Sequence, residues 1–255
     1  MNGRLTGRTA LVTGAARGMG ASIAARLVGE GAQVLLTDID DAEGKRTARE
    51  LEGEYQHLDV TSADDWAAAA DTVRQDRGLL DILVNNAGIG SRPTRFDELD
   101  LEQHRRLFEV NVHGPFLGMR LLLPLLERSG CASVVNISSI DGLTGVAGMA
   151  SYAASKHALT GLTRSVALEV GDLGIRVNSV HPGIIETPMV AGVGEARLAR
   201  LRRTVDRQPT ARMGLPEEVA AMTCFLASDD AAYCTGSQFT VDGGHLAGPW
   251  RESPA

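Results

Sequence analysis

Three side chains in the middle of the chain, Ser139, Tyr152 and Lys156, have the types and spacing of a proton-transfer device. Tyr152 and Lys156 lie four residues apart in a segment with apolar residues at helical spacing, and positions i and i+4 share one helix face. A free tyrosine has a pKa of about 10 and is a poor base near neutral pH, but a fixed cation nearby favours the phenolate. We therefore expect Lys156 to lower the pKa of Tyr152.

Ser139 ends the β-branched run SVVNISS, which is typical of a buried strand. A hydroxyl group at the end of such a strand could polarise a substrate oxygen. A Tyr-x-x-x-Lys pair alone is more often an ordinary pair of helix surface residues, so its interpretation depends on the motifs that accompany it.

A glycine-rich loop near the N-terminus supports a nucleotide-dependent reaction. The residues before it read as a strand and those after it as an amphipathic helix, which is the context that a dinucleotide-binding glycine motif requires. Glycines let the backbone approach a pyrophosphate, and the helix N-terminus supplies unpaired N–H groups. A tight turn without a ligand is the alternative. The loop residues expected to bind a dinucleotide are Gly14, Arg17, Gly18, Met19 and Gly20.

The elements that must position these residues alternate along the chain. Strands are expected at Arg8–Thr13, Gln33–Asp38, Tyr55–Leu58, Asp81–Asn85, the run before Ser139, Ile175–Val180 and Gln238–Val241. Helices are expected at Ala42–Leu51, Ser62–Asp76, Leu101–Arg120, Leu121–Arg128, the Tyr152 segment and Pro216–Leu226. This alternation predicts an α/β fold, a doubly wound parallel sheet with helices on both faces and ligands at the carboxyl ends of its strands.

Two segments, 187–213 and 246–255, give no regular pattern. The first carries several arginines, which we interpret as the solvated face of an amphipathic helix. Met189 and Val190 follow Thr187 directly and are better candidates for substrate contact. In the second segment, Trp250 could pack at a subunit interface or cover the core.

Composition excludes several classes of partner. The 255 residues carry a net charge of −7, which argues against nucleic acid and leaves no polybasic patch for a membrane surface. No apolar run approaches the ~20 residues that span a bilayer. The three cysteines, Cys131, Cys224 and Cys234, do not have the spacing of metal ligands, so we expect no metal site. We interpret them as reduced thiols, which indicates a cytoplasmic location.

The motifs together resemble the short-chain dehydrogenase/reductase family over nearly the whole length. They are Thr13-Gly14-x-x-x-Gly18-x-Gly20, Asn85-Asn86-Ala87-Gly88, Pro182-Gly183-x-x-x-Thr187 and the set Asn111, Ser139, Tyr152, Lys156. The resemblance implies one Rossmann-type domain over 1–255, with 187–213 as a substrate lid and 246–255 as a tail. Within the family the chain is most similar to bacterial NAD-dependent 3α(20β)-hydroxysteroid dehydrogenases.

The resemblance also implies a role for each matched residue. Tyr152 exchanges a proton with the substrate, Ser139 hydrogen-bonds the substrate oxygen, and Lys156 holds the nicotinamide ribose. Asn111 holds a water that links Lys156 to solvent. The remaining implied cofactor contacts are Asp59 and Val60 beside adenine, Asn86, Ala87 and Gly88 near the central sheet, and Pro182, Gly183, Ile185 and Thr187 at the nicotinamide amide. The family further implies a homotetramer, in which helices beginning near Glu98 and Ser151 pack across dyads.

Asp38, at the end of the second strand, indicates which nicotinamide cofactor is used. A carboxylate there can accept both hydroxyls of the adenosine ribose, and it repels a 2′-phosphate. Arg17 could attract that phosphate, but it would have to overcome Asp38, so we expect NAD(H). The alternative role for Asp38 is an N-cap of the next helix, which it could fill at the same time.

The substrate pocket is expected from 90–94, 140–149 and 184–193. These segments contribute the apolar residues Ile140, Leu143, Val146, Met149, Ile184, Met189 and Val190, with the charges Asp141 and Arg92. An apolar wall favours a hydrophobic secondary alcohol or ketone, and a hydroxysteroid is our first expectation. Asp141 is interpreted as a turn residue. Alternatives are a 3-oxoacyl-thioester reductase, a terpene, sugar or polyol dehydrogenase and, from another class, a non-catalytic dinucleotide-sensing protein.

Overall fold

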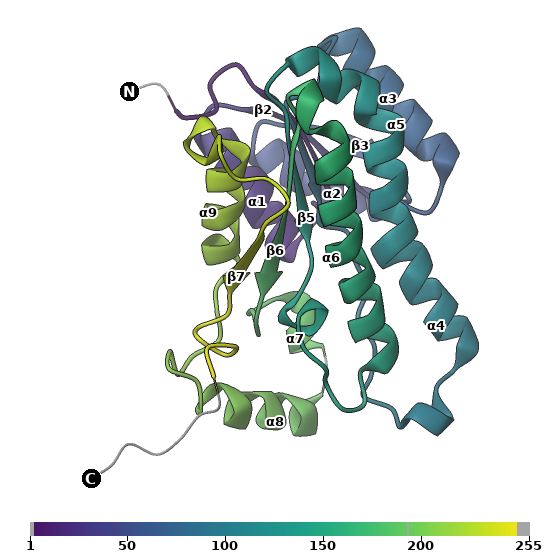
Figure 1. Ribbon diagram of the computed structural model, residues 1–255, viewed down its shortest axis with the longest axis vertical. Coiled ribbons are helices and arrows are strands. Elements are labelled where there is room, and N and C mark those ends of the chain that lie inside the picture. The colour runs from purple at the N-terminus through teal and green to yellow at the C-terminus, as the bar shows by residue number, and fades with distance from the viewer. Residues whose placement is uncertain (1–2, 193, 249–255) are drawn as a thin grey trace.

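The computed structural model describes residues 3–192 and 194–248, which form a parallel sheet between two layers of helices (Figure 1). Within this part of the chain the sheet has seven strands in the order β3-β2-β1-β4-β5-β6-β7. The strands are β1 (Thr9–Thr13), β2 (Gln33–Asp38), β3 (Glu54–His57), β4 (Ile82–Asn85), β5 (Ser133–Ile137), β6 (Arg176–Pro182) and β7 (Gln238–Val241). The predicted α/β architecture is confirmed, and most element bounds differ from prediction by one or two residues.

The helices follow the strands as expected of right-handed crossovers. They are α1 (Gly18–Gly29), α2 (Asp41–Glu50), α3 (Ala63–Asp76), α4 (Leu101–Phe108), α5 (Gly114–Ser129), α6 (Ala150–Val170), α7 (Pro188–Ala191), α8 (Glu195–Val205) and α9 (Pro216–Ala227). In the described part of the chain, we find no helix with the length and hydropathy needed to cross a membrane.

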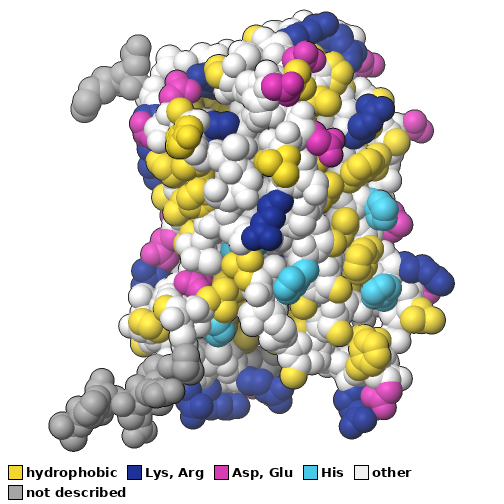
Figure 2. Space-filling model, in the orientation of Figure 1, with side chains coloured by type: hydrophobic (Ala, Val, Ile, Leu, Met, Phe, Trp, Pro, Cys, Tyr) yellow, Lys and Arg dark blue, Asp and Glu magenta, His cyan; other side chains and the backbone are white. Residues whose placement is uncertain are grey.

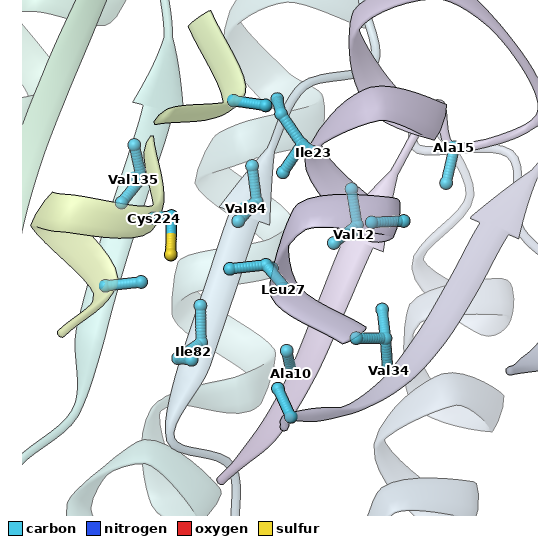
Figure 3. Close-up of a cluster of buried hydrophobic side chains, with 14 of the residues drawn as sticks. Ala10, Val12, Ala15, Ile23, Leu27, Val34, Ile82, Val84, Val135 and Cys224 are labelled. Atoms are coloured by element: carbon cyan, nitrogen blue, oxygen red, sulfur yellow. The ribbon is translucent and has the colours of Figure 1, made fainter. Parts of the chain in front are cut away.

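The inner strands β1, β4 and β5 are buried at every position, because helices cover both faces of the sheet there. Side chains of a strand alternate between faces, so Val12 joins the core under α1 and α9, whereas Leu11 joins the core under α3, α5 and α6. Figure 3 shows the first of these cores, where Ile23 and Leu27 of α1 pack toward Val84 and Cys224. This burial holds the loops at the carboxyl ends of the strands on a rigid base.

The direction of winding reverses at β1, which pairs with β2 on one side and β4 on the other. The chain leaves β1 toward one face of the sheet and β4 toward the opposite face, so their loops diverge and leave a crevice between them. In open α/β sheets, ligands bind at such a switch point.

The predicted helices over 101–120 and 121–128 are wrong in their boundaries. The chain forms α4, then a π-helical turn at Glu109–His113, and then α5, which continues through Pro124. A π turn inserts an extra residue into the helical ladder, and the periodicity of apolar residues does not reveal it. The turn contains Asn111.

The segment 187–213 also differs from the irregular conformation expected for it. It contains the short helix α7 and the helix α8, so the interpretation of its arginines as part of an amphipathic helix was the better one. Figure 1 shows both helices beyond the carboxyl ends of β6 and β7. The predicted tail is described only to Gly248, and Trp250 lies outside the described residues.

Candidate active site

The glycine loop between β1 and α1 lies against the loop that follows β4. Gly14 has φ +64°, and a Cβ atom there would lie 2.8 Å from Cα of Ala87. A Cβ on Gly20 would lie 2.0 Å from the carbonyl oxygen of Gly14, so no other residue fits without moving the backbone. The N-cap of α1, Arg17, makes no side-chain capping bond. The amide groups of this helix end remain available to an anion.

Side-chain hydrogen bonds fix the two loops to one another. Asn86 Nδ2 donates to the carbonyl oxygens of Thr13 (2.8 Å) and Gly14 (3.0 Å). In return, Thr13 Oγ1 accepts the backbone N–H groups of Asn86 and Ala87, each at 3.0 Å. The Asn85-Asn86-Ala87-Gly88 motif therefore holds the shape of the glycine loop.

Asp38 ends β2 at the edge of the same crevice. Its Oδ2 accepts the N–H of Ala16 and its Oδ1 accepts the N–H of Asp40, both at 3.0 Å. These bonds fix the carboxylate and leave each oxygen able to accept a further bond. The alternative role suggested for Asp38 is wrong, because Asp40 caps α2. Arg17 lies 3.5 Å from Asp40, measured from Nη1 to Oδ2.

A cavity of about 580 Å³ opens over these loops. Its lining includes the predicted residues Gly14, Arg17, Gly18, Met19, Gly20, Asp38, Asp59, Val60, Asn86, Ala87, Gly88 and Thr187. Sequence reasoning missed Ile39, Leu58 and Arg106, which also line it. The helical context of Arg106 in the sequence gave no sign that α4 reaches this crevice. Among the predicted contacts, Gly183 and Ile185 line a neighbouring cavity, and Pro182 lines neither.

Ser139 follows β5 and caps a short 3₁₀ turn, with its Oγ accepting the N–H of Asp141 at 3.1 Å. Its carbonyl oxygen is bound by His181, which is fully buried on the neighbouring strand β6. His181 Nδ1 lies 2.8 Å from that oxygen, and Nε2 lies 2.8 Å from Oγ of Ser179. Because a carbonyl can only accept, Nδ1 carries the proton and the ring is held between the two strands. Burial lowers the pKa of His181, which favours the neutral ring.

Tyr152 and Lys156 lie on α6 and point toward the end of β5. The Lys156 ammonium donates to the carbonyl oxygen of Ile137 at 3.0 Å and lies 5.9 Å from the centroid of the Tyr152 ring. Burial and the charge of Asp141 raise the pKa of Tyr152 to about 12, while a hydrogen bond with Ser139 acts in the opposite direction. Burial lowers the pKa of Lys156 to about 8, and Asp141 opposes this shift.

The expectation that Lys156 lowers the pKa of Tyr152 is therefore not met in this structure. Helical spacing places the two groups on one face, but it cannot reveal how deeply both are buried. Desolvation disfavours the phenolate and the ammonium alike. With a pKa of about 12, the phenol of Tyr152 is protonated at neutral pH.

Asn111 is brought to the same place by the π turn. Its Oδ1 accepts the N–H of Ile89 at 2.9 Å, and its Nδ2 donates to Oγ of Ser155 at 3.1 Å. A Cβ atom on Gly88 would lie 3.2 Å from Asn111 Oδ1 and 3.5 Å from Lys156 Nζ. The backbone at Gly88 is thus in contact range of Asn111 and of Lys156, which lies next to Tyr152 on α6.

A second cavity, of about 880 Å³, adjoins Tyr152. Its lining includes Ser139, Tyr152 and the expected Ile140, Asp141, Met149, Ile184, Met189, Val190 and Arg92, together with Gln103 and Leu201, which were not predicted. The expected Leu143 and Val146 are absent from that lining as described. Met189 lines both cavities. The two cavities therefore adjoin at Met189.

Comparisons with known proteins place this geometry in a family. A family model described as enoyl-(acyl carrier protein) reductase matches residues 14–245. The 3-alpha-(or 20-beta)-hydroxysteroid dehydrogenase of Mycobacterium tuberculosis is 46% identical over 97% of this chain and 93% of its own. The trans-4-hydroxycyclohexanecarboxylate dehydrogenase of Sinomonas cyclohexanicum is 40% identical over 96% of this chain and 95% of its own.

A solved structure agrees with these relatives. The crystal structure of levodione reductase superposes with a TM-score of 0.92 at 31% identity and covers 96% of this chain and 100% of that one. The chain belongs to the short-chain dehydrogenase/reductase family, whose dehydrogenases use nicotinamide dinucleotide cofactors.

Proposed function

We propose that the protein transfers a hydride between NAD(H) and a hydrophobic ring ketone or secondary alcohol, with a hydroxysteroid as the leading candidate. The observation that carries the proposal is that two cavities share Met189 in their lining, and that the larger of them is also lined by Ser139 and Tyr152. One has the glycine loop and Asp38 that suit a dinucleotide, and the other is of about 880 Å³ with a largely apolar wall. That volume lies within the range of about 300–1,000 Å³ typical of small-molecule sites.

The residues present fit a dinucleotide cofactor. The close approach of Gly14 and Gly20 to neighbouring backbone leaves room for a pyrophosphate where any side chain would intrude. Asp38 would accept hydrogen bonds from the ribose hydroxyls. Arg17 forms an ion pair with Asp40, so its charge is partly neutralised and attracts a 2′-phosphate less, which supports NAD(H) over NADP(H). The bound nicotinamide would supply or accept the hydride. Lys156 would hold its ribose, and Thr187 its amide.

In the reaction that we propose, the chain's own residues handle the proton. Ser139 would hold the substrate oxygen by a hydrogen bond that strengthens as negative charge develops on that oxygen. Tyr152 would donate a proton to it during reduction, or accept one during oxidation. Lys156 and Asn111 would connect Tyr152 to solvent. The raised pKa of Tyr152 favours the protonated phenol, which is the form that reduction requires.

A substrate and cofactor panel tests the proposal. Steroid, cyclohexyl, aromatic, polyol and acyl-thioester ketones would be compared by the oxidation of NADH and of NADPH. We expect activity on ring ketones with a higher kcat/KM for NADH. Activity restricted to polyols or linear 3-oxoacyl thioesters would reject the substrate proposal, and a preference for NADPH would reject the cofactor proposal.

Asp38→Ala provides the sharper test of cofactor choice. The substitution removes both the ribose contact and the repulsion of a 2′-phosphate, so the ratio of kcat/KM for NADH over NADPH should fall by at least about tenfold. Glu43→Gln is the matched control, because it removes a carboxylate from the next helix that pairs with Arg46 and leaves the pair of Arg17 and Asp40 intact. A ratio unchanged by Asp38→Ala would show that this carboxylate does not select the cofactor.

For location and assembly we propose a cytoplasmic homotetramer. The three cysteines are free thiols, which supports a reducing compartment. The assembly is argued below from the exposed face of α6.

A further inference from the structure

A third cavity, of about 660 Å³, lies on α8 and is strongly basic. Arg200 and Arg203 line it from one face of α8, and Arg207 lines it from the turn that follows the helix. Figure 2 shows Lys and Arg side chains along the lower edge of the molecule, where Figure 1 has α8. We call this space the basic cavity.

The charge of the basic cavity has no counterpart in the described part of the chain. Several exposed arginines elsewhere are paired, as Arg46 is with Glu43 and Glu50, and Arg212 with Glu218. In contrast, no described residue forms an ion pair with Arg200, Arg203 or Arg207, and Asp206 beside them makes none. Like charges at helical spacing destabilise a helix. A cluster of this kind in a chain of net charge −7 calls for an external anion.

The floor of the basic cavity is ordered. Gln208 is 8% exposed, and its side-chain oxygen lies 2.8 Å from Nδ1 of His245. An amide oxygen can only accept, so Nδ1 carries the proton and Nε2 is left without a partner in the described structure. The free Nε2 of the neutral ring is an acceptor, so it can take a hydrogen bond from a hydroxyl or amide group of a ligand, and the three guanidinium groups supply the donors for its anionic part.

The basic cavity neighbours the substrate cavity. Leu201, from the same helix, lines the substrate cavity, and His245 interacts electrostatically with Asp141, which also lines it. Helix α8 thus separates an apolar space beside Tyr152 from a cationic one. One elongated substrate with an apolar end and an anionic end would match both.

We propose that the basic cavity binds the phosphate groups of a coenzyme A thioester whose ring ketone lies in the substrate cavity. Guanidinium groups pair with phosphate oxygens through two parallel hydrogen bonds, and several phosphates account for three arginines better than one carboxylate does. The volume of about 660 Å³ is that of a nucleotide-sized site. The inference rests on the proposed function for the ring end of the substrate.

Calorimetric titration of coenzyme A tests the site directly, with saturating NADH present to fill the dinucleotide cavity. Arg203→Gln and Arg207→Gln should each weaken binding by about tenfold or more, since each loses a charge-assisted hydrogen bond. Arg202→Gln on the same helix does not line the cavity and should change binding by less than about threefold, an effect of general charge alone. Equal losses in the three variants, or no binding by the wild type, would overturn the inference.

Kinetics separate this inference from the proposed function. The pair of substrates is methyl 4-oxocyclohexanecarboxylate and the coenzyme A thioester of the same acid. Arg203→Gln should raise KM for the thioester and leave KM for the methyl ester unchanged. If neither ketone is reduced while calorimetry still shows arginine-dependent binding, the proposed function fails and the anion site stands. Reduction of a carrier-protein thioester without any binding of coenzyme A would overturn the site.

Discussion

At the scale of single residues, burial dominates the electrostatics of the site. Lys156 is buried and Tyr152 is half-buried beside the substrate cavity. Desolvation disfavours the charged form of each, so the pKa of Tyr152 rises to about 12 and that of Lys156 falls to about 8. The nearest negative charge that acts on both is Asp141, whose own pKa is raised by burial. Burial and the charge of Asp141 therefore set the pKa at which Tyr152 loses its proton.

Tyr152→Phe isolates the proton transfer. The phenyl ring keeps the packing and loses the hydroxyl, so NADH should bind nearly as tightly while turnover falls by at least about 10²-fold. Fluorescence titration of NADH and steady-state turnover on one ring ketone measure the two effects. Near-wild-type turnover would remove Tyr152 from the chemistry.

Asp141→Asn should change the pH dependence of reduction. The negative charge of Asp141 raises the pKa of Tyr152 and of Lys156, so its removal lowers both. Reduction needs the protonated phenol, and its rate falls as pH rises through the controlling pKa. The alkaline fall in kcat/KM should therefore begin at lower pH in the variant than in the wild type. Superimposable profiles would show that Asp141 exerts no such control, and would leave it the turn residue expected from sequence.

At the scale of elements, the end of β5 is held in place by β6. His181 joins Ser139 and Ser179 through its two ring nitrogens, and Lys156 of α6 binds the carbonyl of Ile137 at the same strand end. Three elements thus fix the backbone from which the Ser139 hydroxyl projects. Such support is needed because a catalytic hydrogen bond depends on placement within a fraction of an ångström.

His181→Leu should remove this support. Leucine leaves the Ser139 carbonyl and the Ser179 hydroxyl buried without that partner, which costs about 1–3 kcal/mol of folding stability. The Ser139 hydroxyl should also lose its alignment, so that kcat for a ring ketone falls while KM for NADH stays the same. Chemical denaturation and steady-state kinetics test both. Ser179→Ala is the control, since it removes the bonds of the Ser179 hydroxyl to His181 and Ser237 but keeps the bond from His181 to Ser139, and it should affect stability more than kcat.

Sequence predicted the elements well because the apolar runs of β1, β4 and β5 reflect burial on both faces of the sheet. It also placed the loop residues that line the dinucleotide cavity, because their spacing is local. It missed the π turn around Asn111, whose extra residue leaves the apolar pattern intact. Leu201 and Arg106 were missed as lining residues because tertiary packing alone brings α8 and α4 to the cavities. The raised pKa of Tyr152 was not predicted either, because it results from burial, which the spacing of Tyr152 and Lys156 does not reveal.

At the scale of the whole molecule, α6 presents an unusual outer face. Ala154, Gly161 and Leu168 are exposed at seven-residue intervals, and Leu168 is 88% exposed. Phe116 of the neighbouring helix α5 is 46% exposed. Ala153, next to Ala154 on the same helix, is buried and takes no part in this face. A stripe of small residues flanked by exposed apolar ones permits close packing of a second helix.

Gly161 makes the assembly testable without disturbing the protomer. A Cβ atom there would meet no atom within 4 Å, so a larger side chain has open space in a single chain. Glycine within a helix costs about 1 kcal/mol relative to alanine, and packing against a second copy would explain its presence. We expect the wild type to have the mass of a homotetramer in light scattering and Gly161→Glu to have a smaller mass with its helical content retained. Gly161→Ala, which adds one methyl group, should keep most of the assembly. A wild type that is monomeric at micromolar concentrations would contradict the tetramer, and a Gly161→Glu variant of unchanged mass would show that the subunits meet on another surface.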